Sequence, residues 1–186
     1  MKTSTRYVID ENMRIVAVGG DWEKFGQENQ AQNLSFSDVK NRSIFDFVLG
    51  ETSRIWLHSL IRMAMETKQT VHQSYRCDSP DAKRYMLMTI TPEENGNLTI
   101  EHTLTSEQPR QHRVEINYSA SENENAKVLH CNVCGKLHVD GEWIDVDRDQ
   151  DQPQVYHNVN GTTCEQCLDK TQSESVSTSA DYCAAN

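Results

Sequence analysis

The sequence predicts an α+β fold, in which an antiparallel sheet with helices on one face is followed by a small module held together by cysteines. Within residues 1–105, apolar residues alternate with a period of two near both ends and follow the period of an α-helix in between. A third observation is a pair of Cys-X-X-Cys motifs, Cys131–Cys134 and Cys164–Cys167, separated by 29 residues. We therefore expect one ordinary domain and a small satellite within 186 residues.

The first elements are short. Residues 7–18 predict two strands joined by a polar turn, which is a β-hairpin. Residues 21–32 predict a short helix with Asp21 as its cap, and residues 35–48 predict one or two helical turns that end at Gly50.

A longer helix is predicted over residues 51–67, because apolar residues repeat there at the spacing of one helical face. Three strands follow, over residues 71–77, 83–91 and 97–105. Only one face of the last strand is apolar, so we expect an antiparallel sheet with one wet face and helices on the other. A single sheet forms only if the first hairpin returns beside the last three strands.

This order of strands, helices and strands resembles the PAS sensory fold. The segment of residues 41–48, Asn-Arg-Ser-Ile-Phe-Asp-Phe-Val, resembles the Gly-Arg-Ser-Leu-Phe-Asp-Phe-type segment of many bacterial PAS domains, with Asn41 in place of the glycine. The resemblance covers residues 6–105 and implies a PAS-like sensory domain over residues 1–110. It implies a small molecule or cofactor bound between the sheet and the small helices, or a dimerising relay without ligand.

Two cofactors of PAS domains are disfavoured. The flavin-binding class places a reactive cysteine in an Asn-Cys-Arg-Phe-Leu-type segment, and this chain has no cysteine before Cys77. Haem-binding members use a histidine on a core helix, and His58 lies on the predicted long helix. We interpret His58 as an ordinary histidine at the border of a packed face.

The paired motifs predict a structural zinc site with Cys131, Cys134, Cys164 and Cys167 as ligands. A two-residue gap lets one tight turn present both sulfurs to one ion, and two such turns complete a tetrahedron. Glycine after the second sulfur permits a positive φ in the first turn, and Asn160-Gly161 before the second motif is a turn signal. The 29 intervening residues must fold back on themselves.

Other readings of the cysteines stay open. They include a disulfide pair, redox-active dithiols and unrelated buried cysteines. His130, His138 and His157 lie near the motifs and are alternative ligands, or groups that orient a ligand. Four sulfurs close a tetrahedron, whereas a catalytic zinc keeps one position open for water, so we expect no enzyme.

Charge is unevenly divided along the chain. Residues 1–110 carry 13 Lys or Arg and 15 Asp or Glu, a balance of −2, whereas residues 111–186 carry 5 and 13, a balance of −8. A module this acidic repels phosphates, which disfavours nucleic-acid binding. It resembles the cysteine-ribbon module of bacterial PAS-containing signalling proteins, with Gly141-Glu142-Trp143 as part of the resemblance.

The predicted location is the cytoplasm. The N-terminal residues lack the apolar core of a signal peptide, and no stretch has the roughly 18 apolar residues of a membrane span. Cytosolic thiols stay reduced, which favours metal binding. The predicted divisions after the first domain are a strand extension and acidic linker over 111–126, a zinc-ribbon-like module over 127–170, and a disordered tail over 171–186 with Cys183 as a free thiol.

Several other side chains have two interpretations each. Cys77 is either a reactive thiolate beside Arg76 or a half-buried strand cysteine, and we favour the second. A charged quartet lies around a predicted turn and consists of Arg76, Asp78, Asp81 and Arg84. It either binds a polar ligand or stabilises the turn by ion pairs, and we favour ion pairs. Four methionines, Met63, Met65, Met86 and Met88, either line an adaptable pocket or fill the core, and we favour the core.

These features together predict a non-enzymatic sensory or regulatory protein. Its PAS-like domain binds a small ligand or a partner, and the zinc module mediates an interaction, with the signal leaving through a partner protein or through dimerisation. One rival is a redox or metal-responsive switch that uses the paired cysteines. A second rival is a catalytic metal site.

Overall fold

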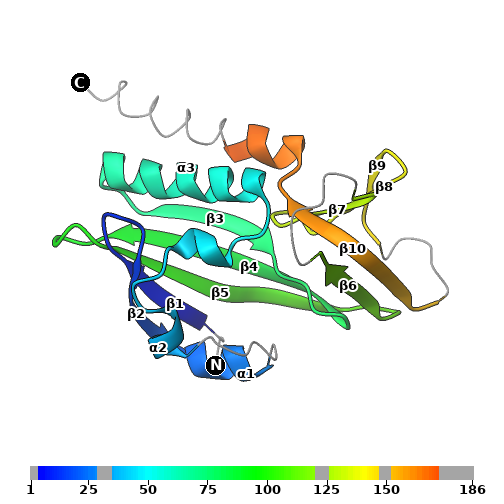
Figure 1. Cartoon of the computed structure of the whole chain (residues 1–186), viewed down its shortest axis with the longest axis horizontal. Coiled ribbons are helices and arrows are strands. Elements are labelled where there is room, and N and C mark those ends of the chain that lie inside the picture. Colours follow the sequence, from blue (N-terminus) through cyan, green and yellow to red (C-terminus); the bar gives the residue numbers. More distant parts are fainter. Residues whose placement is uncertain (1–3, 29–34, 120–125, 147–151, 172–186) are drawn as a thin grey trace.

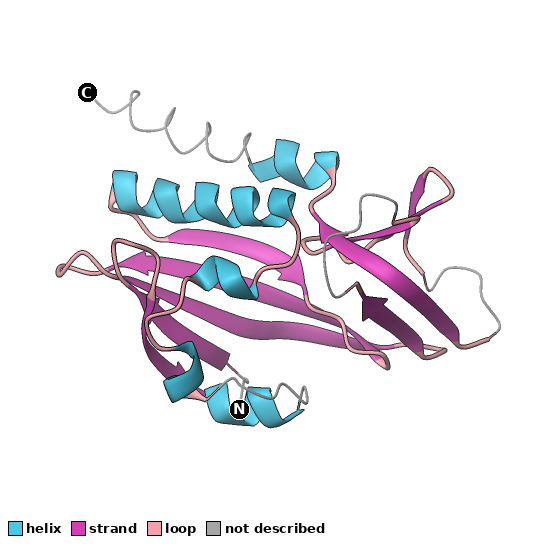
Figure 2. Cartoon of the chain, viewed as in Figure 1, coloured by secondary structure: helices cyan, strands magenta, loops and turns pink. Residues whose placement is uncertain are grey.

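Two five-stranded sheets lie side by side in the computed structural model, which describes residues 4–28, 35–119, 126–146 and 152–171 (Figure 1). Helices cover one face of the first sheet, and the second sheet lies at one end of the longest helix (Figure 2). The chain therefore combines helices with two mostly antiparallel sheets.

The first sheet has the strand order β2-β1-β5-β4-β3, and every neighbouring pair in it is antiparallel. The N-terminal hairpin returns beside the last three strands through pairing of β1 with β5, as a single sheet requires. The strands are β1 (Ser4–Ile9), β2 (Ile15–Gly20), β3 (Val71–Arg76), β4 (Ala82–Pro92) and β5 (Leu98–Pro109).

Four of the described helices lie between β2 and β3 in the sequence. They are α1 (Trp22–Glu28), α2 (Phe36–Val39), the 3-10 helix η1 (Ile44–Phe47) and α3 (Glu51–Thr67). The predicted helix over residues 51–67 is confirmed at both ends. Residues 29–32 of the predicted first helix lie outside the described residues.

The main core lies between α3 and the first sheet. Leu60, Ile61 and Ala64 of α3 are buried at the predicted helical spacing, and Ile90 and Ile100 are buried on the facing strands. Each of these Leu and Ile side chains contributes roughly 1.5–3 kcal/mol when it is fully buried. The core also includes Met88, with Met63 and Met65 packed against it, which agrees with our core interpretation of Met63 and Met65. Met88 fits both interpretations, because it also lines a cavity.

The second sheet has the order β6-β10-β7-β8-β9. Strand β10 is parallel to both of its neighbours, β6 and β7, whereas β7 with β8 and β8 with β9 pair in antiparallel fashion. The residues between the two cysteine motifs fold back as predicted and supply β8, β9 and β10. The strands are β6 (Val114–Tyr118), β7 (Val128–Cys131), β8 (Leu137–Val139), β9 (Glu142–Ile144) and β10 (Gln154–Thr162).

The turn predicted at Asn160-Gly161 is wrong, because both residues lie within β10. Gly161 instead permits a close backbone approach. A Cβ atom there would lie 3.0 Å from Cβ of Leu49 and 3.0 Å from Nδ2 of Asn132, and a Cβ at Gly50 would lie 2.0 Å from the Gly161 carbonyl oxygen. The glycines therefore let the loop before α3 contact the second sheet.

Parts of the predicted divisions remain outside the described residues. Residues 111–126 contain β6, which is a separate strand paired with β10 in the second sheet, and residues 120–125 of the predicted linker are not described. Thr171 is the last described residue of a helix that begins at residue 165, and the rest of the predicted tail, including Cys183, is not described. Among the described helices, none combines the length and apolar character needed to cross a membrane.

Candidate metal centre

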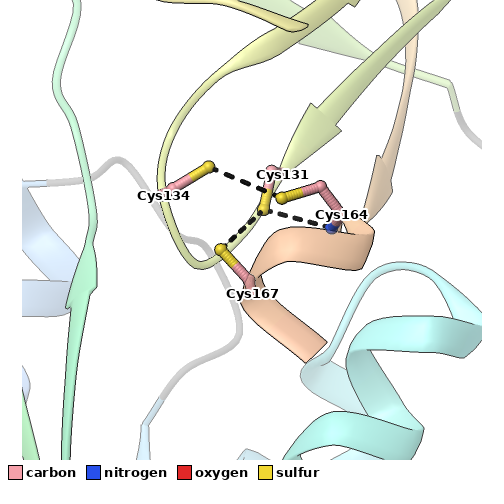
Figure 3. Close-up of side chains that lie close together, drawn as sticks. All are labelled: Cys131, Cys134, Cys164 and Cys167. Carbon is pink, nitrogen blue, oxygen red and sulfur yellow. Dashed lines mark hydrogen bonds between the residues drawn. The ribbon is translucent and has the colours of Figure 1, made fainter. Parts of the chain in front are cut away.

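The four motif cysteines converge from two separate segments (Figure 3). Cys131 ends β7 and Cys134 lies in the turn before β8, where Gly135 has the predicted positive φ of 70°. The Gly135 amide closes this turn by donating to the Cys131 carbonyl at 2.8 Å. Cys164 precedes the helix of residues 165–171, and Cys167 lies in its first turn.

The sulfur positions fit a single tetrahedral ion. All four Sγ atoms lie within 4.8 Å of one another, and the Cys131–Cys167 and Cys134–Cys164 pairs are both 3.9 Å apart. Because Zn–S bonds are about 2.3 Å long, the sulfurs of a tetrahedral zinc site lie about 3.8 Å apart. A disulfide needs about 2.05 Å, so these cysteines are free and can hold a metal ion.

Burial and mutual hydrogen bonding control the charge of these sulfurs. Cys131 and Cys164 are buried, whereas Cys134 and Cys167 are half-buried. The pKa of the Cys131 thiol is lowered because Cys134 and Cys167 stabilise its thiolate. The hydrogen bond with the Cys131 sulfur favours the protonated form of Cys134 and raises the pKa of Cys134 to about 11. The backbone amide of Cys164 also donates to the Cys131 sulfur at 3.4 Å, which supports a negatively charged, metal-binding sulfur.

No histidine belongs to this cluster in the described part of the chain. The buried His130 ring has its Nδ1 2.8 Å from the Tyr118 hydroxyl. His138 packs against Trp143, with ring centroids 5.2 Å apart. His157 is exposed and has its Nδ1 3.3 Å from the Asn117 amide nitrogen. The sulfur set predicted from the sequence is therefore the set that the fold brings together.

The first cysteine motif is fastened to the N-terminal domain. The Asn132 side-chain amide donates to the Leu49 carbonyl and to the Ser53 hydroxyl, both at 2.9 Å. The Val133 carbonyl accepts from the Arg76 amide at 2.8 Å. One motif therefore contacts both the start of α3 and the end of β3.

The second motif contacts the same end of α3. The Thr163 amide donates to the Thr52 hydroxyl at 2.9 Å, and the Ser53 and Thr163 hydroxyls are 3.2 Å apart. The Trp56 indole donates to the Thr171 hydroxyl at 2.9 Å. Because Cys131, Val133 and Cys164 also belong to the main hydrophobic core, the metal cluster is packed into the first domain.

A nearly buried ion-pair network lies beside the first motif. Asp78 pairs with Arg76 and, at 2.7 Å, with Arg110. Asp145, which follows β9, joins Arg76 at 3.2 Å and Lys83 at 2.9 Å. This network links the second sheet to β3 and β4, and buried charges of this kind need such pairing.

The predicted quartet does not converge on one site. Arg76 and Asp78 pair with each other, whereas Asp81 pairs with Arg113 and Arg84 pairs with Glu107. This arrangement agrees with the ion-pair interpretation. Cys77 is an exposed residue directly after β3, so our prediction of a half-buried strand cysteine is wrong. The residue lies just beyond the last ladder position at Arg76, where the alternation of the strand no longer applies.

A cavity of about 390 Å³ lies between the first sheet, η1, α3 and the first cysteine motif. The resemblance implies a ligand between the sheet and the small helices, whereas sequence reasoning missed the contribution of the cysteine motif and of His102 to the wall. At its polar end, His102 Nδ1 lies 2.8 Å from the Tyr75 hydroxyl and Nε2 lies 3.3 Å from the Tyr7 hydroxyl. His102 stands in an inward-facing series with Leu98 and Ile100, and that polar interruption was the available signal. His58, in contrast, is exposed and does not line the cavity.

Comparisons with known proteins leave the geometry as the only guide to function. No protein-family model matches the chain, and no curated protein or solved structure matches it significantly.

Proposed function

We propose that this chain is a non-enzymatic sensory or regulatory protein, in which a PAS-like N-terminal domain binds a small ligand or a partner and a zinc-stabilised module mediates an interaction. The observation that carries the proposal is a four-sulfur cluster fastened to a domain that contains a ligand-sized cavity. Metal binding and ligand binding would then belong to one structural unit.

Zinc is the ion that the donor set favours. Four thiolates suit a soft or borderline ion in tetrahedral geometry, and zinc is bound in this way at structural sites. The cysteines would hold the ion, and the Cys164 amide would neutralise part of the charge on Cys131. Because four sulfurs fill the tetrahedron, the ion would have no open position for water, which favours a structural role over catalysis.

The PAS interpretation draws support from the strand order of the first sheet. The hairpin of β1 and β2 lies beside β5, with the helices α1, α2, η1 and α3 between β2 and β3 in sequence. The cavity lies between this sheet and the small helices, where the resemblance places a ligand. Fold alone does not assign a function, so the proposal rests on the cavity and the cysteines.

Such a protein would transmit its signal by direct contact with a partner protein or a second copy of the chain. Leu49 and Ile55 are large apolar side chains that are about half exposed near the start of α3, at 48% and 55%. Exposed apolar side chains of this kind favour association with a partner or with a second copy. They lie next to the residues that receive both cysteine motifs, so a change at the metal cluster would reach this surface.

Native mass spectrometry tests the proposal with the full chain, purified in reduced form without added metal. We expect one zinc ion per chain, and the same spectrum reports subunit number and any retained small molecule. Protein that is folded, reduced and free of metal would contradict the zinc module.

A redox or metal-responsive switch is the second candidate, favoured by the half-buried sulfurs of Cys134 and Cys167. Peroxide would oxidise two thiolates to a disulfide, be reduced to water, and release the ion. Thiol titration with parallel zinc detection tests this route. Zinc release in step with thiol loss under mild peroxide supports the switch, and unchanged zinc content excludes it.

A further inference from the structure

We propose that the cavity is a composite ligand site that takes an uncharged, largely aromatic molecule with one hydrogen-bond acceptor. We further propose that the first cysteine motif forms part of its wall, so that ligand affinity depends on the bound metal. This inference rests on the proposed function and names its ligand class and its regulation.

The size and walls of the cavity suit a ring compound. Its volume of about 390 Å³ lies within the range of roughly 300–1,000 Å³ that small-molecule sites occupy. Aromatic side chains from both domain layers face it, with Tyr7 and Tyr75 on the sheet and Trp22, Phe47 and Trp56 on the helices. Such walls favour a flat aromatic ligand through stacked and edge-on contacts.

The lining excludes a charged ligand. None of the described residues that form the cavity is Asp, Glu, Lys or Arg. The one titratable imidazole is His102, and burial lowers its pKa to about 4, so it is neutral at pH 7. A charged group placed here would lose its water without gaining an ion partner, which is strongly unfavourable.

The polar end supplies one spare donor. A neutral imidazole has one N–H group and one bare nitrogen, and in His102 these face the hydroxyls of Tyr75 and Tyr7. One tyrosine therefore donates to His102, whereas the other accepts from it and keeps its own O–H proton for another acceptor. A carbonyl or a ring nitrogen on the ligand would receive that proton.

Another part of the wall is built by the first cysteine motif. Asn132 stands between Cys131 and Val133, lines the cavity, and donates to the Ser53 hydroxyl, which also lines it. The turn that carries Asn132 is closed by the hydrogen bond from the Gly135 amide to the Cys131 carbonyl, and an ion held by all four sulfurs would tie this turn to the second motif. Loss of the ion would therefore release this wall, and by reciprocity a bound ligand would strengthen metal retention.

The probe is 2-acetylnaphthalene, a neutral ketone, titrated into zinc-loaded full-length protein whose native spectrum shows no retained small molecule. Quenching of tryptophan fluorescence reports binding, because Trp22 and Trp56 line the cavity. The anion 2-naphthoate has nearly the same shape, and we expect it to bind at least about 100-fold more weakly. Equal affinity for the ketone and the carboxylate, or no binding of the ketone, would overturn the ligand class.

The hydrogen bond is tested with 2-isopropenylnaphthalene, in which a methylene group replaces the carbonyl oxygen. We expect about 3- to 10-fold weaker binding than the ketone. The spare proton belongs to Tyr7 or to Tyr75, so one of the two substitutions Tyr7→Phe and Tyr75→Phe should remove most of that preference. The matched control is Tyr85→Phe, whose hydroxyl bonds to Gln108 and does not line the cavity, and it should preserve the preference. An unchanged preference in both Tyr7→Phe and Tyr75→Phe would contradict the assigned polar end.

Metal dependence has two readouts. Removal of zinc with a chelator should weaken ketone binding at least about 10-fold, and re-addition of zinc should restore it. Asn132→Ala should keep one zinc per chain and weaken the ketone about 3- to 10-fold, whereas Asn117→Ala, far from the cavity lining, should change neither. If neither chelation nor Asn132→Ala changes the affinity for the ketone, the coupling between metal and ligand is refuted, although the zinc module is not. If the protein never binds zinc but does bind the ketone, both the zinc module and the coupling are refuted, whereas the proposed ligand class is supported.

Discussion

The two sheets differ in how they are stabilised. The first packs against α3 and buries a continuous series of aliphatic and aromatic side chains, including Ile9, Ile61 and Ile100 with no exposed surface. Among its described residues, the second has a separate buried cluster of four side chains, Val114, Leu137, Val146 and Val159. Its cysteines belong to the core of the first domain instead. We therefore expect the second region to depend on a bound ion and on docking for its stability, since this cluster is small.

The substitution with the largest expected effect on stability removes one sulfur ligand. Cys164→Ser should abolish zinc binding and lower the free energy of unfolding of the second sheet by about 5 kcal/mol or more, because a structural ion contributes its binding free energy to folding. Hydrogen exchange should show lost protection in β7 and β10 and retained protection in β4. Cys77→Ser is the control, since Cys77 is exposed and outside the cluster. Equal effects of the two substitutions would break the contrast.

The buried ion-pair network should be the next most sensitive feature. Asp78→Ala leaves Arg76 and Arg110 without their shared carboxylate in a nearly buried setting, so the free energy of unfolding should fall by about 3–5 kcal/mol. Chemical denaturation measures the change. Asp81→Ala removes an exposed pair with Arg113 and should cost less than about 1 kcal/mol. A small effect of Asp78→Ala would show that the buried charges beside the first motif contribute little to stability.

Acid should destabilise the first domain because the buried His102 side chain resists protonation. The ordinary histidine pKa is about 6.5, and burial lowers that of His102 to about 4. The unfolded chain binds more protons between these values, so stability is full above pH 6.5 and falls by about 3 kcal/mol as the pH drops to 4. His102→Gln should remove this part of the slope in urea denaturation. His72→Gln, at an exposed position, should keep it, and metal loss at low pH affects both variants equally.

The docking contact at α3 should give the smallest effect. Thr52→Val leaves the Thr163 amide without its acceptor and should cost about 1–2 kcal/mol. Thr67→Val, whose hydroxyl donates to the Met63 carbonyl at the exposed end of the same helix, should stay within about 0.5 kcal/mol. Chemical denaturation of both variants with zinc bound measures the two changes in the free energy of unfolding. No change for Thr52→Val would show that this contact does not stabilise the docking of the second motif on α3.

The fold could be predicted where local patterns and packing agree. The limits of α3 follow from the apolar repeat at Leu57, Leu60 and Ile61. The sulfur cluster follows from the short spacing within each motif, because two residues between cysteines leave one compact turn.

The remainder depends on contacts between distant residues, which no local pattern encodes. Parallel pairing of β10 with β6 and β7 joins segments far apart in sequence. Gly161 looked like a turn residue, although its role is to admit the Leu49 loop. The part of the cavity wall that Asn132 forms also escaped prediction, since Asn132 contacts Ser53 across 79 positions of the chain.

The most direct test of the account is X-ray absorption at the zinc edge of the full-length, reduced protein. The account predicts one ion per chain with four sulfur ligands at about 2.3 Å. Fewer than four sulfurs with nitrogen or oxygen in the remaining positions, or the absence of zinc, would contradict it.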